Sequence, residues 1–155
     1  MSGVTLGDAI PPVTLADADG AAIDLAAMKG APLVVYFYPK ADTPGCTVEA
    51  QDFTRLAPDF AKLNAQILAV SRDAPAKLCK FRDKYGLTVR LASDEDGAVC
   101  DVFGTWVEKQ NYGRSYMGIE RSTFLFGADG KLAKEWRKVR VKGHAEAVLE
   151  AAKAL

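Results

Sequence analysis

Cys46 is the residue best placed to do chemistry, because it follows a short turn, residues 42–45, that leads into an expected helix. The apolar segment 33–38 precedes the turn and is typical of a buried strand. The first N–H groups of a helix have no intrahelical partner, and the helix dipole places partial positive charge there. Both effects favour a thiolate over a thiol. We therefore expect Cys46 to act as a nucleophile rather than only as a small buried side chain.

The residues after Cys46 predict the helix that would hold it. Apolar side chains recur at spacings of three or four, namely at Ala50, Phe53, Ala57, Phe60 and Leu63. This pattern predicts a helix over 44–63 with a kink at Pro58. Thr43 suits the N-cap position and Pro44 the first helical position. Cys46 lies on the apolar stripe, so the pattern predicts a thiol shielded from water.

Composition narrows the possible functions. The chain has 155 residues, 49% of them hydrophobic, which favours one domain spanning 1–155 with a substantial core. Twenty basic and twenty acidic residues cancel, which argues against a nucleic-acid or anionic-membrane surface. No leader pattern or membrane-spanning run is found, and three cysteines without a close pair do not form a secreted disulfide framework. We expect a cytoplasmic protein in which any disulfide is transient.

The order of the other elements predicts an α/β protein. The expected elements are a hairpin of 13–15 and 22–25, a short helix ending near Gly30, strands 33–38 and 67–70, helices 75–85 and 94–103, strands 123–126 and 132–139, and a helix after Gly143. A strand–helix–strand unit implies a parallel crossover, and the last two strands must pair antiparallel. The prediction is a thioredoxin-like fold: a mixed central β-sheet flanked by helices, with an N-terminal β-hairpin.

Three sequence blocks carry a resemblance to a known family. The motif Pro39-x-x-x-Thr43-x-x-Cys46 resembles the active site of the peroxiredoxins, and the string 37–47 resembles their peroxiredoxin Q (bacterioferritin comigratory protein) subfamily. Residues 118–125, and 136–139 followed by 143–145, are similar to later segments of that subfamily. The resemblance implies a thiol peroxidase that reduces hydrogen peroxide and organic hydroperoxides without a metal or cofactor. It also implies a monomer that is re-reduced by thioredoxin or a similar dithiol.

The resemblance assigns roles to particular residues. Cys46 would attack the peroxide and become a sulfenic acid, while Arg121 would stabilise the thiolate and the departing oxygen. Thr43 would hold the peroxide through its hydroxyl, and Pro39 would wall the pocket. Glu49, one turn after Cys46, is expected to orient Arg121 through an ion pair; the alternative is an exposed first-turn glutamate.

The second thiol is where the chain departs from the common pattern. Many members of the subfamily carry a cysteine five residues after the first, and this chain has Gln51 there. Others place it on a later helix, and Cys79 falls within the expected helix 75–85. The apolar stripe of that helix leaves Cys79 on a flank with Arg82 and Asp83. Cys79 is therefore the candidate resolving thiol. The alternatives are an incidental surface cysteine and a one-cysteine mechanism resolved by an external thiol.

Other functions have weaker support in the sequence. A dithiol oxidoreductase lacks its Cys-x-x-Cys pair, and a zinc site lacks any short ligand pair. A Cys–His hydrolase would need His144, which opens the last expected helix and suits a cap better than a base. Cys100 lies on an apolar side and is expected in the core. A binding module with an incidental Cys46 stays open, and consumption of peroxide would distinguish it from an enzyme.

Overall fold

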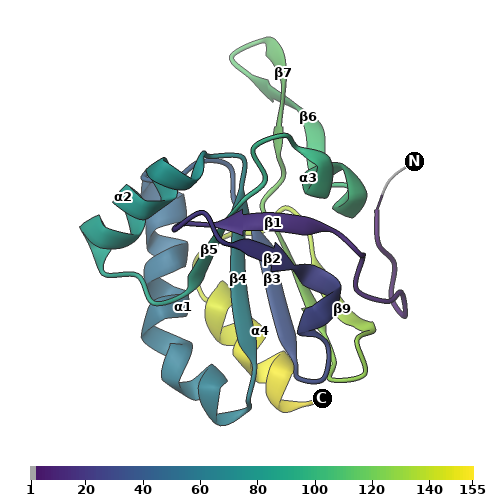
Figure 1. Cartoon of the computed structure of the whole chain (residues 1–155). Coiled ribbons are helices and arrows are strands. Elements are labelled where there is room, and N and C mark those ends of the chain that lie inside the picture. The colour runs from purple at the N-terminus through teal and green to yellow at the C-terminus, as the bar shows by residue number, and fades with distance from the viewer. Residues whose placement is uncertain (1–2) are drawn as a thin grey trace.

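The computed structural model describes residues 3–155, so the first two residues of the expected domain 1–155 lie outside the described part. A seven-stranded sheet forms its centre, in the order β2-β1-β5-β4-β3-β8-β9 (Figure 1). Its strands are β1 (Thr14–Asp17), β2 (Ala22–Asp24), β3 (Leu33–Phe37), β4 (Gln66–Ser71), β5 (Arg90–Ser93), β8 (Ser122–Phe126) and β9 (Leu132–Trp136). The sheet is mixed, because β3, β4 and β5 pair in parallel whereas the remaining pairs are antiparallel.

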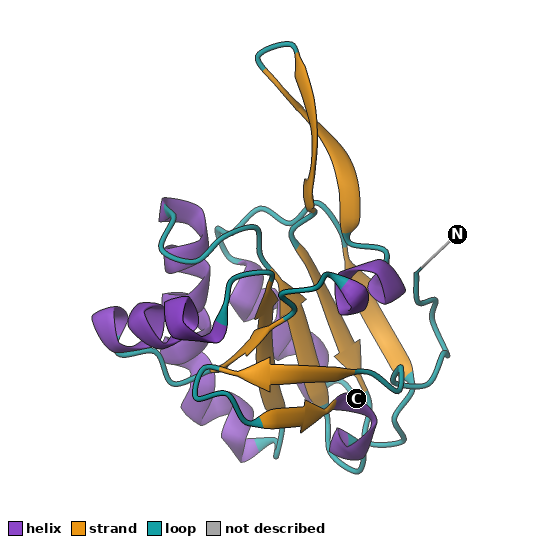
Figure 2. Cartoon of the chain, turned by 45° about the horizontal axis from the view of Figure 1, so that its top comes forward, coloured by secondary structure: helices purple, strands orange, loops and turns teal. Residues whose placement is uncertain are grey.

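Helices cover both faces of this sheet (Figure 2). They are the 3₁₀ helix η1 (Leu25–Met28) and the α-helices α1 (Pro44–Lys62), α2 (Pro75–Tyr85), α3 (Ala98–Phe103) and α4 (His144–Lys153). The side chains of β3 alternate between two cores: Val34 and Tyr36 pack with α1, α2 and α4, whereas Val35 and Phe37 pack with α3 and the N-terminal segment. All five residues of β3 are buried, as its continuous apolar run predicts.

The expected architecture is confirmed, including the N-terminal hairpin, the parallel crossover through α1 and the antiparallel pair of β8 and β9. Helix α1 continues through Pro58 and ends at Lys62. The helix expected over 94–103 begins later, at Ala98, because the Asp94 side chain lies before it and accepts hydrogen bonds from its first turn. The strand expected to reach 139 ends at Trp136.

Sequence patterns missed one prominent feature, a second hairpin of β6 (Trp106–Asn111) and β7 (Arg114–Ile119). It projects from the end of the sheet where α1 begins (Figures 1 and 2). Its strands are largely exposed and mostly polar, so they carry no strong apolar alternation. The turn uses two residues of positive φ, Tyr112 and Gly113, as tight hairpins require.

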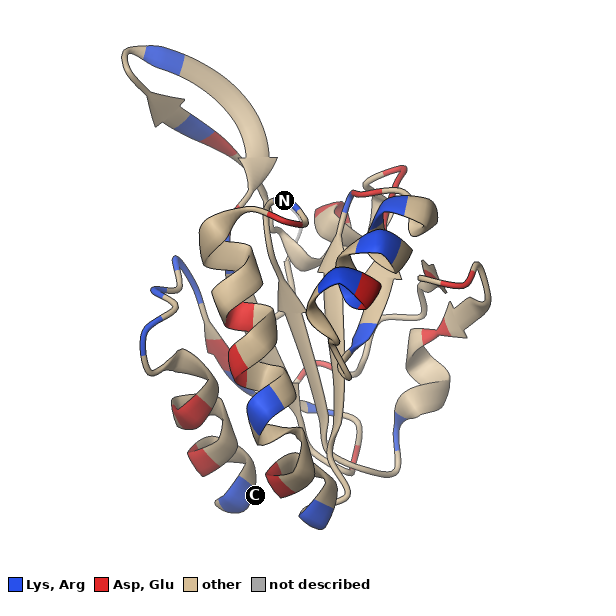
Figure 3. Cartoon of the chain, turned by 90° about the vertical axis from the view of Figure 1, so that its left-hand side faces the viewer, with Lys and Arg blue, Asp and Glu red and all other residues tan. Residues whose placement is uncertain are grey.

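Charged side chains are spread over the helical face. Both acidic and basic residues occur on α1, α2 and α4, with basic residues in the majority on α2 (Figure 3). None of the helices in the described residues is both long and apolar enough to span a membrane.

Candidate active site

Cys46 lies at the start of α1, just after the loop that connects β3 to this helix. Thr43 is the N-cap residue, with extended backbone, and Pro44 is the first helical residue, as the sequence predicts. The Thr43 hydroxyl does not cap the helix; its Oγ1 donates to the Lys40 carbonyl oxygen at 2.8 Å. Cys46 is 2% exposed and packs in the core between α1 and the sheet. The sulfur is therefore shielded and lies in the first helical turn.

Arg121 brings a positive charge to this sulfur from the loop before β8. Its Nη2 donates to Cys46 Sγ at 3.4 Å, and its Nη1 donates to Glu49 Oε1 at 2.6 Å. Glu49 is 1% exposed, so it is not the solvated first-turn glutamate of the alternative interpretation. The pairing of β8 with β3 brings Arg121 to the site across a long sequence separation. One guanidinium thus contacts both a thiol and a buried carboxylate.

Gly45 leaves room for that guanidinium. A Cβ at this position would lie 3.2 Å from Arg121 Nη2, closer than ordinary van der Waals contact. The glycine is in the helix without positive φ, so its backbone conformation does not require glycine. Its place in the structure is explained by the close approach of Arg121.

Burial and the neighbouring opposite charge shift the pKa values of Glu49 and Arg121 in opposite directions. Burial raises the pKa of Glu49 to about 7, although the neighbouring guanidinium lowers it. Burial also lowers the pKa of Arg121, but Glu49 and Cys46 outweigh it, so the net shift of that pKa is upward. Arg121 is therefore positively charged at every physiological pH.

A polar environment lies beneath the sulfur as well. Glu49 Oε2 and the Tyr36 hydroxyl are buried without a hydrogen-bond partner among the described residues. Burial raises the pKa of Tyr36 well above its usual range, with Glu49 adding to the effect, so the phenol is neutral. Tyr36 stacks on Phe53 of α1, with ring centroids 4.6 Å apart. This stacking fixes the floor of the site against the helix that carries Cys46.

A cavity of about 490 Å³ opens beside the loop that precedes α1. Its lining includes Pro39, Lys40, Trp106, Lys109, Tyr116 and Ile119. The last four belong to the β6–β7 hairpin, which has no clear signal in the sequence. Burial lowers the pKa of Lys109, and the positive charge of Arg121 lowers it further. The hairpin therefore adds an apolar wall and a second cation beside the site.

Comparisons with known proteins show the family of this chain. Residues 6–135 match the AhpC/TSA family. Peroxiredoxin Bcp of Bacillus subtilis is 43% identical over 150 residues, which cover 97% of this chain and 96% of that protein. This chain belongs to the peroxiredoxins.

Solved structures of peroxiredoxins support the same assignment and show the thioredoxin-like fold. A cysteine-to-serine variant of Xanthomonas campestris peroxiredoxin Q has a TM-score of 0.90 and 45% identity, covering 97% of this chain and 99% of that one. A similar variant of Xylella fastidiosa peroxiredoxin Q has a TM-score of 0.93 and 39% identity, covering 99% and 98%. The resemblance to this subfamily is thereby confirmed.

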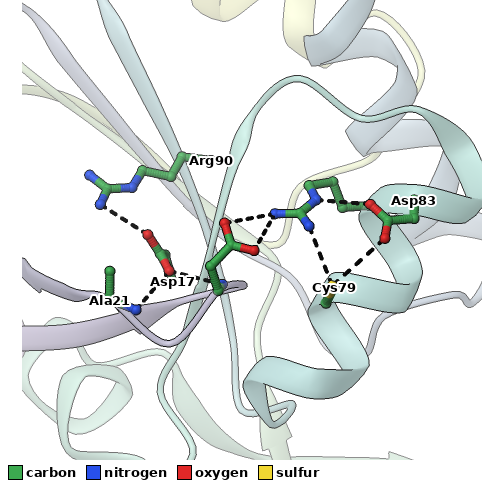
Figure 4. Close-up of polar contacts among 7 residues, drawn as sticks. Asp17, Ala21, Cys79, Asp83 and Arg90 are labelled. Carbon is green, nitrogen blue, oxygen red and sulfur yellow. Dashed lines mark hydrogen bonds and ion pairs between the residues drawn. The ribbon is translucent and has the colours of Figure 1, made fainter.

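Cys79, the candidate second thiol of this peroxiredoxin, is half-buried on α2 and forms no disulfide. Its Sγ accepts a hydrogen bond from Arg82 Nη2 at 3.3 Å and lies 3.7 Å from Asp83 Oδ2 (Figure 4). Two cysteines have been replaced singly by serine in the Xanthomonas protein, and they lie further apart in its sequence than Cys46 and Cys79 do here. A role for Cys79 must therefore be argued from its own surroundings.

Cys100 packs in a different core cluster from Cys46, and the His144 ring contacts a residue of β8. Cys100 is fully buried, and burial raises the pKa of its thiol, so it is an inert core residue. His144 Nε2 lies 2.7 Å from Thr123 Oγ1, and burial lowers the pKa of the imidazole to about 4. The expectation of a capping His144 is wrong, because Gly143 holds the N-cap position. Within residues 3–155, no cluster of three or more metal-ligating side chains is present.

Proposed function

We propose that this thiol peroxidase uses Cys46 as its peroxidatic residue and reduces hydrogen peroxide and organic hydroperoxides. One observation carries the proposal: Cys46 is 2% exposed and lies in the first turn of α1, with its sulfur 3.4 Å from the Arg121 guanidinium. Helix dipole and guanidinium together favour the nucleophilic thiolate. The alkyl peroxide reduction activity of the similar Xanthomonas bacterioferritin comigratory protein supports the substrate class.

The chemistry follows from these positions. The Cys46 thiolate attacks one peroxide oxygen, an S–O bond forms, and the O–O bond breaks. The electron pair leaves with the second oxygen as hydroxide or alkoxide, which takes up a proton to give water or an alcohol. Cys46 is left as a sulfenic acid. Arg121 stabilises the negative charge as it passes from sulfur to the departing oxygen.

Thr43 and Pro39 hold the substrate in this proposal. The Thr43 hydroxyl donates its hydrogen bond to the Lys40 carbonyl oxygen, so its lone pairs stay available to accept a hydrogen bond from the peroxide O–H. Pro39 lines the adjacent cavity and has no N–H that would need a partner there.

Glu49 has a positioning role. Its carboxylate accepts from Arg121 Nη1, while Nη2 of the same group reaches the sulfur. Because a guanidinium is planar, fixing one nitrogen fixes the direction of the other. Burial of the carboxylate excludes water that would compete for Arg121. Glu49 therefore holds the guanidinium in the orientation that the reaction needs.

Cys79 resolves the sulfenic acid in this scheme. Its sulfur attacks the Cys46 sulfur, an S–S bond forms, the S–O bond breaks, and hydroxide leaves as water after protonation. Disulfide formation requires the two Cα atoms to come within about 7 Å, and a shielded Cys46 must first leave its pocket. The first turn of α1 has few helical hydrogen bonds and contains Gly45, so it opens at low cost. Thioredoxin or a similar dithiol then reduces the disulfide.

The same scheme needs neither a partner subunit nor an oxidising compartment. We place the enzyme in the cytoplasm, where reducing dithiols are available, and assign it as a monomer, as the resemblance to the peroxiredoxin Q subfamily implies. Equilibrium sedimentation at micromolar concentration tests the assignment of a monomer.

Three variants in a thioredoxin-coupled peroxide assay test the proposal. Cys46→Ser is expected to fold and to have no turnover, because a hydroxyl is not ionised near neutral pH. Cys79→Ser is expected to oxidise once and then accumulate sulfenic or sulfinic acid at Cys46. Cys100→Ala is the matched control and is expected to cycle normally. Normal cycling of Cys79→Ser would instead support a one-cysteine mechanism, and turnover by Cys46→Ser would contradict the assignment of the nucleophile.

A further inference from the structure

The surroundings of Cys79 repeat the pattern found at Cys46. In both places an arginine Nη2 donates to the sulfur, at 3.4 Å for Cys46 and at 3.3 Å for Cys79. In both places carboxylates hold that arginine. At Cys46 the holder is the buried Glu49, and at Cys79 the holders are exposed aspartates. An incidental surface cysteine does not need such a set of partners.

Arg82 is held from two directions. Its Nη1 donates to both carboxylate oxygens of Asp19, at 3.2 and 3.1 Å, and its Nε donates to Asp83 Oδ1 at 3.1 Å. Asp19 belongs to the turn between β1 and β2, which is distant in sequence from α2. The guanidinium is thus held at two of its three nitrogens, Nη1 and Nε, so Nη2 is directed at Cys79.

We propose that Arg82 is the positioning and activating residue for the resolving thiol, with Asp19 as its anchor. The proposal rests on the resolving role of Cys79 given above. The Cys79 thiol, which donates to Asp83 Oδ2 at 3.7 Å, loses its proton to solvent, and Arg82 stabilises the negative charge left on Sγ. The resulting thiolate attacks the sulfur of the Cys46 sulfenic acid, the S–S bond forms, and the departing hydroxide becomes water.

The contact is suited to a reaction that follows local opening. Cys79 and Arg82 are one turn apart on the same helix, so their contact needs only α2 to stay folded. Opening of the first turn of α1 breaks the Arg121 contact to Cys46 but leaves the Arg82 contact to Cys79 unchanged. The link from Arg82 to Asp19 also ties α2 to the N-terminal hairpin. The second thiol therefore stays activated while the first one moves.

The neighbouring charges provide a matched control. Arg90 of β5 lies in the same area and pairs with Asp17 of β1, at 3.2 Å, but it makes no hydrogen bond to Cys79. Removing Arg90 deletes the same charge from the same face and keeps the Arg82 contact. Arg82→Lys keeps the positive charge but loses the planar guanidinium that Asp19 and Asp83 hold together.

The test measures alkylation of Cys79 by iodoacetamide between pH 6 and 10, in a Cys46→Ser background, with each adduct assigned by peptide mapping. Arg82→Gln is expected to slow alkylation at neutral pH by about twofold to fivefold, because a charge contact that is open to solvent has only a modest effect. Arg82→Lys should recover part of the loss, Asp19→Asn should lose part of the rate, and Arg90→Gln should match the parent. Circular dichroism checks that each variant is folded.

The second arm uses chains with all three cysteines and one equivalent of hydrogen peroxide. Arg82→Gln should form the Cys46 sulfenic acid at the parental rate and the 46–79 disulfide more slowly, by the same factor. An unchanged alkylation profile, an equal effect of Arg90→Gln, or an unchanged rate of disulfide formation would each overturn the role of Arg82. Cycling of Cys79→Ser with thioredoxin would overturn the resolving role itself, and that result is distinguishable because the alkylation arm does not depend on it.

Discussion

Gly45→Ala offers a sharp test of the site because it should lower activity without lowering stability. The new Cβ would lie 3.2 Å from Arg121 Nη2, so the guanidinium must retreat by a few tenths of an ångström. That movement lengthens a contact to Cys46 that is already 3.4 Å long. Hydrogen bonds that involve a charged group contribute about 1.5–3 kcal/mol. A loss of about 1–2 kcal/mol corresponds to a rate of peroxide reduction about 5- to 30-fold lower.

Stability should not fall in this variant. Alanine is favoured over glycine within helices by up to about 1 kcal/mol, so the free energy of unfolding should stay the same or rise. Stopped-flow oxidation of Cys46 by hydrogen peroxide measures the rate, and urea unfolding measures the stability. In an Arg121→Gln background the same substitution should change the rate less than about twofold, since the contact is already lost. A full parental rate in Gly45→Ala, or an equal loss in both backgrounds, would refute the proposed steric role.

Three other changes have defined outcomes. Arg121→Gln should lower kcat/KM for hydrogen peroxide by about 100- to 1000-fold, as expected when a preorganised donor to developing charge is removed, and a loss below about tenfold would remove Arg121 from the mechanism. His144 has a folded pKa of about 4 against 6.5 in the unfolded chain. This group therefore adds about 3 kcal/mol to the free energy of unfolding as pH rises from 4 to 6.5. Urea unfolding of His144→Gln should not show that increase. Glu49 changes stability with pH in the opposite direction, because its folded pKa of about 7 lies above the usual 4.5. Its contribution to the free energy of unfolding is full below pH 4.5 and is lost by pH 7. Glu49→Gln should abolish that loss of stability.

Elements with a clear apolar period were predictable from the sequence. The strand at 33–37 and helix α1 follow their patterns of buried residues to within a residue or two. The β6–β7 hairpin was not predictable in this way, because it is largely exposed and pairs only with itself. Strand β5 has four residues, too few for a periodic signal. Its place in the sheet depends on pairing with β4 and β1, which a local pattern does not contain.

The candidate site was likewise predictable from the sequence only in part. Local sequence was enough to place Cys46 in the first turn of a helix after a strand. The contacts of Arg121 depend on the pairing of β8 with β3, so only the resemblance to a family pointed to them. The burial of Glu49 and the closeness of Gly45 to Arg121 follow from that same pairing and have no signal of their own in the sequence. The Arg82–Asp19 pair joins α2 to a turn in the N-terminal hairpin and was likewise not visible locally.

The most direct test of the account is to find which sulfur is oxidised first. The reduced protein is mixed with less than one equivalent of hydrogen peroxide in the presence of dimedone, which traps sulfenic acids, and the adducts are mapped by mass spectrometry. The account predicts an adduct at Cys46, with Cys79 and Cys100 unmodified, and a 46–79 disulfide in its place when dimedone is omitted. An adduct at Cys79 while the Cys46 thiol stays reduced would contradict the central claim.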